Sequence, residues 1–127
     1  MSSILDDVKH MLGILPEQID FDVDIINFVN GAFGTLTQLG VGPAIGYQIT
    51  SSENQWDEFF TDPRLSAVKT YVFLRTKIAF DPPTTGFTQQ AMERQIQELE
   101  FRLNVVVDYD MKIDEPDDGT VFDGGGV

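Results

Sequence analysis

Apolar side chains recur every three or four residues along most of the chain, the spacing of a helix with one buried face. A first pattern, capped by Ser3 with Asp6 in its first turn, predicts a short helix that ends near residue 15. A second predicts a longer helix that Asp20 or Asp22 caps. The apolar face of that longer helix consists of Phe21, Ile25, Phe28, Val29, Ala32, Leu36 and Leu39.

The next segment mixes loop and short-element signals. Residues 41–52 are typical of a loop, with room for a short strand at Tyr47–Thr50. Ser52 and Gln55 have the spacing of a capping box and predict a short helix after them. That helix carries three aromatic residues, which we expect either to pack inward or to form a contact between subunits: Trp56, Phe59 and Phe60.

A helical hairpin is predicted from about 64–80 and 88–106. The first helix is apolar over a wide arc, which is typical of a central helix surrounded by others. Pro82 and Pro83 disfavour helix in the residues before them, so this helix must end near Phe80. Thr88 is the expected cap of the second helix, with Phe87 and Met92 as a hydrophobic staple.

After Asn104 the apolar period changes from 3.6 to 2, which indicates a strand. No second strong strand exists in the chain, so we expect this arm to pair with a sheet edge of a partner. The prediction is a mainly α fold, a small bundle of about four to five helices at 1–106 with an acidic, extended arm at 107–127. The arm residues expected to bind another protein or a neighbouring subunit are Val107, Tyr109, Met111, Ile113, Val121 and Phe122.

The composition limits the function classes. The net charge is −13, with 21 acidic and 8 basic residues, and such a surface repels a phosphate backbone. It remains compatible with a protein that surrounds DNA without gripping it. The sequence contains no cysteine and no apolar run long enough for a membrane span, and Asp6 and Asp7 stand where a signal peptide needs positive charge. We therefore expect a soluble protein, made in the cytosol, without disulfides.

Candidate chemistry is sparse. His10 is the only histidine, so a triad or a histidine-based metal site cannot be assembled within one chain. Asp20, Asp22 and Asp24 begin like a calcium loop, but Ile25 stands where the turn requires glycine. No catalytic residue, metal or cofactor is predicted. An enzyme would need two acids brought close together in a pocket, and nothing in the sequence singles out such a pair.

The order of elements resembles the head–tail connector (adaptor) proteins of tailed bacteriophages. The resemblance covers about Ser2 to Val106. It rests mainly on Ile25–Gly42, on DPRL at Asp62–Leu65, and on the FDPP turn with the helix that follows.

The resemblance implies a small helical protein of the virion neck, made in the host cytoplasm and assembled as a ring, typically of twelve copies. It implies docking on the portal protein and a link to a stopper or tail-completion protein, with DNA passing through during genome ejection without specific binding. It brings no catalytic residues. The alternative is a small regulatory or adaptor module of the cell whose acidic tail binds a basic partner.

Overall fold

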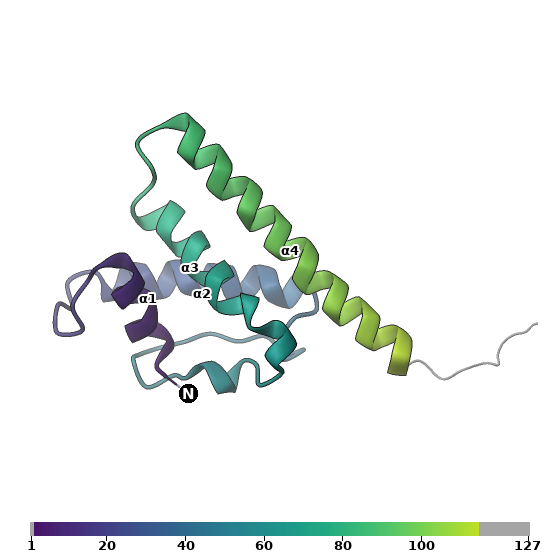
Figure 1. The fold of residues 1–127 in the computed structure, drawn as a ribbon. Helices are drawn as coiled ribbons and strands as arrows, with labels where there is room; N and C mark the ends of the chain where they lie inside the picture. The colour runs from purple at the N-terminus through teal and green to yellow at the C-terminus, as the bar shows by residue number, and fades with distance from the viewer. Residues whose placement is uncertain (1, 115–127) are drawn as a thin grey trace, which may run out of the picture.

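Helix α3, Ala67–Phe80, lies at the centre of the fold and packs against the other three α-helices (Figure 1). The computed structural model describes residues 2–114, with side chains described as far as Tyr109. The predicted mainly α fold is confirmed, and α3 is central as its wide apolar arc predicts. The elements in chain order are α1 Ile4–Leu12, α2 Asp22–Gln38, the single 3-10 turns η1 Trp56–Glu58 and η2 Pro63–Leu65, then α3, then α4 Gly86–Asp114.

The first two helices begin in different ways. The Oγ of Ser3 accepts a hydrogen bond from the backbone N–H of Asp6 at 3.2 Å, so the predicted cap of α1 is confirmed. For α2 the predicted aspartate cap is wrong, because Phe21 occupies the cap position without a side-chain bond. The Asp22 carboxylate instead pairs with Lys9 on α1 at 2.7 Å. An acid predicted to act within its own helix therefore ties two helices together.

The long connection between α2 and η1 contains no strand among the described residues, so the strand predicted at Tyr47–Thr50 is wrong. The Asn30 side chain on α2 satisfies both backbone groups of Ile49, at 2.7 and 3.0 Å. The predicted Ser52 cap is also wrong, because Gln55 occupies the cap position of η1 without a side-chain bond. The Asn54 side-chain oxygen accepts the backbone N–H groups of Thr50 and Ser51. Side chains here supply the hydrogen bonds that a neighbouring strand would have made.

The corner between α3 and α4 confirms the predicted stop at Phe80. Helix α4 begins earlier than predicted, at Gly86, because the Thr85 hydroxyl accepts the backbone N–H of Thr88 at 3.2 Å. Thr88 as the cap is therefore wrong. The staple is wrong as well, since Phe87 is 84% exposed.

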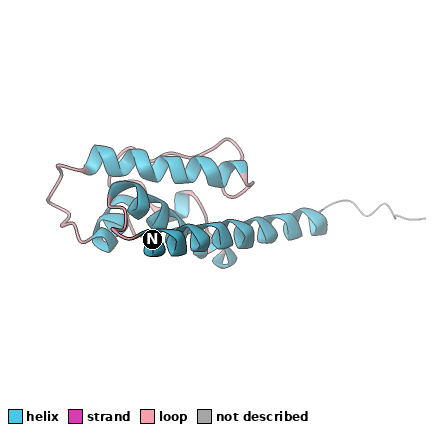
Figure 2. Cartoon of the chain, turned by 90° about the horizontal axis from the view of Figure 1, so that it is seen from above, coloured by secondary structure: helices cyan, strands magenta, loops and turns pink. Residues whose placement is uncertain are grey.

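Helix α4 then continues through residues 107–114, so the predicted strand at its C-terminal end is wrong (Figure 2). A lone strand without a partner leaves its N–H and C=O groups unpaired, whereas a helix pairs them within the segment. Val106 and Val107 are partly buried, which continues the apolar face of the helix past the predicted boundary. The last turns of α4 extend beyond the other helices (Figures 1 and 2). The division into 1–106 and 107–127 stays a prediction.

Candidate interaction surface

One face of α4 is fixed to the body. Its buried residues Ile96, Leu99 and Leu103 form a seam against the core. At the end of the seam, a Cβ on Gly40 would lie 3.2 Å from Cγ1 of Val107, so the backbone after α2 closely approaches α4. The side-chain amide of Asn104 donates to the Leu39 carbonyl at 3.2 Å. The helix is thus held against the end of α2 well past its midpoint.

A polar network adds to this hold. The Tyr71 hydroxyl on α3 donates to the Glu100 carboxylate on α4 at 2.7 Å and accepts from Arg75 at 2.7 Å. Arg75 also donates to the Thr35 hydroxyl on α2 at 3.0 Å. Burial, with the Glu100 hydrogen bond, raises the pKa of Tyr71 to about 12. Helices α2, α3 and α4 are therefore joined by one chain of charge-assisted hydrogen bonds.

The opposite face of α4 carries apolar side chains that touch no core. Residues two positions apart in a helix point about 200° apart, so Phe101 and Val105 point away from the buried Leu103 between them. Phe101 is 70%, Val105 47% and Tyr109 57% exposed. Their four-residue spacing places the three on one line along the helix, and we call Phe101, Val105 and Tyr109 the outer stripe.

The predicted arm residues lie in different environments. Val107 packs against its own chain, and Tyr109 belongs to the exposed outer stripe. Met111 and Ile113 lie in the helical backbone of α4, without described side chains, and Val121 and Phe122 lie outside the described residues. Sequence reasoning missed Phe101 and Val105, although their spacing, offset by two from the core seam, was the available signal.

The aromatic residues of η1 lie inside the chain. Trp56, Phe59 and Phe60 are at most 7% exposed. Trp56 and Phe59 pack against Phe33 of α2, whose ring centroid lies 4.6 Å from that of Phe59, and Phe60 packs against Trp56. The Trp56 indole N–H donates to an Asp7 carboxylate oxygen at 2.8 Å. These three side chains leave little surface for a contact between subunits.

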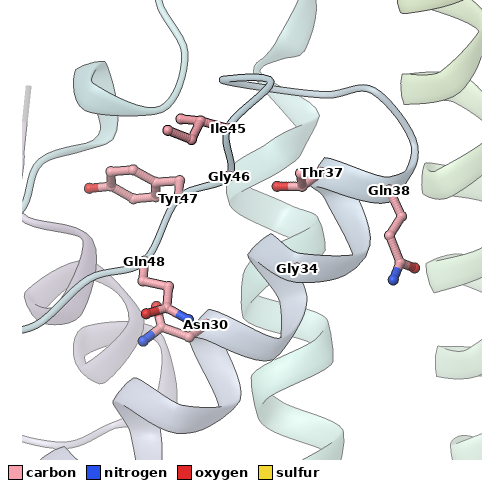
Figure 3. A pocket seen from close by; sticks show the side chains of 8 residues that line it. All are labelled: Asn30, Gly34, Thr37, Gln38, Ile45, Gly46, Tyr47 and Gln48. Atoms are coloured by element: carbon pink, nitrogen blue, oxygen red, sulfur yellow. The ribbon is translucent and has the colours of Figure 1, made fainter.

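A hollow of about 570 Å³ lies between α2 and the loop that follows it (Figure 3). None of its lining side chains is charged at neutral pH, so the hollow offers hydrogen bonds but no acid–base pair. Its residues are Asn30, Gly34, Thr37, Gln38, Ile45, Gly46, Tyr47 and Gln48.

The acidic residues do not gather into a metal site. No group of three or more histidine or carboxylate ligands occurs among the described residues. Of the predicted calcium-like triplet, Asp22 is committed to Lys9, while Asp20 and Asp24 are exposed. His10 is exposed, beside a small hollow that Trp56 also lines. No helix in the described part of the chain is long and apolar enough to cross a membrane.

The fold and its surface define a class: a small helical protein whose distinctive surface is an apolar helix face suited to binding another protein. Residues 4–110 match the family described as Phage connector protein, so the chain belongs to that family. No curated protein and no solved structure matches the chain.

Family membership confirms the resemblance seen in the sequence. The chain is a structural protein of the bacteriophage particle and belongs to its head–tail connection. It contacts other components of the virion. The members of this family are structural proteins and generally not enzymes.

Proposed function

We propose that this protein is a ring-forming adaptor in the virion neck that docks on the portal and joins the DNA-filled head to a stopper or tail-completion protein. The observation that carries the proposal is the family match over residues 4–110. A ring of twelve copies is the stoichiometry implied by the resemblance. The protein acts by assembly, without turnover of a substrate.

The C-terminal segment, residues 107–127, is the proposed docking element for the portal or a neighbouring subunit. Its first part is helical and extends past the other helices, with the Tyr109 side chain exposed (Figure 1). Docking would therefore use a helix face, not the addition of a strand to a sheet. Met111, Ile113, Val121 and Phe122 stay predicted contacts.

An acidic passage for DNA is the second part of the proposal. The chain carries 21 acids against 8 bases. Several of the bases are already neutralised inside the chain, including Lys9 by Asp22, Lys77 by Asp81 and Arg102 by Glu98. A ring of such subunits would repel phosphates, which lets DNA slide through during ejection without being retained.

The mass of the protein alone and mixed with the portal protein of the same phage tests this function. The expected result is a closed ring bound to the portal. The mass of the bound ring should be a whole multiple of the mass of one chain. Removal of residues 115–127, which leaves α4 whole, is expected to weaken portal binding severalfold. A protein that forms no assembly with the portal would overturn the proposal, and undiminished binding after truncation would remove those thirteen residues from the docking element.

A further inference from the structure

The backbone beside the hollow between α2 and its following loop has hydrogen-bonding groups that the chain does not use. The Asn30 side chain binds both the N–H and the C=O of Ile49, so these two groups face the same side, toward α2. In an extended strand the two groups of one residue share a side, and residues two apart share it as well. The N–H and C=O of Tyr47 therefore also face α2, and they make no hydrogen bond within the described part of the chain.

The hollow has room for a second extended segment. Its walls are helix α2 and the backbone from Gly46 to Gln48 (Figure 3). A Cβ at Gly34 would meet nothing within 4 Å, and a glycine lets another backbone come close. The volume of about 570 Å³ is within the range of binding pockets. A segment laid here would pair with Tyr47 as a peptide adds to the edge of a sheet.

One segment of the same chain can reach the hollow. Helix α2 ends beside the hollow at Gln38, and Gly40 then lies against Val107 of α4. From Val107, α4 continues for about 10 Å to its end. Residues 115–120 span up to about 20 Å when extended, so the chain is long enough to return to the end of α2 and enter the hollow.

The composition of that segment fits the hollow. Residues 119–122 are an uncharged run between Asp118 and Asp123, and Thr, Val and Phe within it are residue types common in strands. The side chains that line the hollow are uncharged too, in a chain with 21 acids and 8 bases. Ile45, which lines the hollow and is 97% exposed, offers an apolar contact for Phe122.

We propose that residues 119–122 bind in the hollow of their own chain, as a strand paired with Tyr47 and lying over Gly34. The inference goes beyond the proposed function, because it concerns the free subunit. A subunit that holds its own segment keeps Val121 and Phe122 from contacting other proteins until a partner displaces them. Two of the predicted docking residues are thus covered before assembly.

Cysteine cross-linking of the protein alone tests the contact, and the chain has no native cysteine to interfere. A chain carrying Thr120→Cys and Gln48→Cys is mildly oxidised at low concentration, and a disulfide needs the two Cβ atoms within about 4.5 Å. The expected product is a monomer with an internal disulfide. The matched control carries Thr120→Cys with Gln18→Cys, since Gln18 is an exposed glutamine outside the hollow, and should give much less of it.

Two results would overturn the inference. Covalent dimers in place of the internal disulfide would show that the segment binds a second copy. Equal internal product in the two variants would show that the segment does not select the hollow.

Amide hydrogen exchange of residues 120–122 gives an independent measurement. We expect exchange about tenfold slower than in a free peptide, because paired amides exchange only when the contact opens. Gly34→Val, which places a side chain in the hollow, should remove this protection. Gly31→Val is the matched control, because Gly31 is also an exposed glycine of α2 with nothing within 4 Å but does not line the hollow.

Equal protection in the Gly34→Val and Gly31→Val variants, or none in the unaltered protein, would contradict the inference. Neither measurement includes the portal protein. Failure here therefore leaves the proposed function standing, and a failure to bind the portal leaves this inference standing.

Discussion

The aromatic residues around η1 and those on the outer face of α4 are of the same residue types but differ in exposure. Trp56, Phe59 and Phe60 are buried in the chain's own core, whereas Phe101 and Tyr109 stand in solvent. Both groups are candidates for intersubunit contact when only residue type is considered. Trp56, Phe59 and Phe60 belong to the core cluster that contains Phe33, whereas in the described part of the chain Phe101 and Tyr109 are not packed against that cluster. Exposure, not aromatic content, distinguishes the two groups.

The largest test of this contrast truncates one phenylalanine from each region. Phe33→Ala should lower the free energy of unfolding by about 4 kcal/mol, because it empties the centre of the aromatic cluster. Phe101→Ala should change it by no more than about 0.5 kcal/mol. Chemical unfolding of both variants measures the two values. Similar losses in the two variants would show that Phe101 is also a core residue.

The glycines beside the cluster sharpen the comparison. A Cβ at Gly42 would lie 2.4 Å from the Phe59 ring, at a φ of 86° that side chains rarely adopt. Gly46 shares the positive φ, at 99°, but has open space around it. Gly42→Ala should cost about 3 kcal/mol and Gly46→Ala about 1 kcal/mol, so the difference measures the clash alone. Thermal or urea unfolding of the matched pair decides it, and equal costs would mean that the Phe59 ring moves freely.

The pair between Lys9 and Asp22 tests the junction of α1 and α2. Lys9 is 1% exposed, and its ammonium group also donates to the Pro16 carbonyl at 3.0 Å. Asp22→Asn should cost about 2 kcal/mol, because it leaves a buried charge unpaired, with the loss reduced by the partial exposure of Asp22. Lys9→Met, which removes the charge and keeps the stem, should cost less. The reverse order in equilibrium unfolding would contradict this account.

The smallest expected effect concerns the face of α4 that is fixed to the body. The pKa of Tyr71 is raised from 10.0 to about 12, so the folded protein keeps the Tyr71 hydroxyl proton to a higher pH than the unfolded chain does. The associated stability is fully present below pH 10 and is lost as the pH rises toward 12. Tyr71→Phe should flatten the fall in unfolding free energy between these pH values. An unchanged pH dependence in the variant would show that other groups cause the fall.

The helices with one clear apolar face could be predicted from sequence, because that periodicity directly reflects burial. The Ser3 cap and the stop at Phe80 followed from local rules and are confirmed. Residues 107–113 could not be assigned in the same way. Their alternation fits a strand locally, yet the helix continues because Val107 finds a place beside Gly40, 67 positions earlier in the chain.

The candidate surface was less predictable than the fold. Tyr109, a predicted contact of the C-terminal region, is exposed, but Phe101 and Val105 lie within a helix that already has a core seam. A helix with two apolar faces has a weak period, and only the fold tells which face is covered. Conversely, the burial of Trp56 depends on Phe33 and Asp7, which are distant in sequence.

The length of α4 has a mechanical consequence. Its 29 residues make a rod of about 43 Å, held against the other helices from Ile96 to Val107. The part after Val107 extends roughly 10 Å further, so a bend of about 10° there would shift the end of the helix by roughly 2 Å and leave the seam in place, by the same helix dimensions. A small bend in this last part would thus move the end of α4 toward or away from a binding partner without disturbing the core.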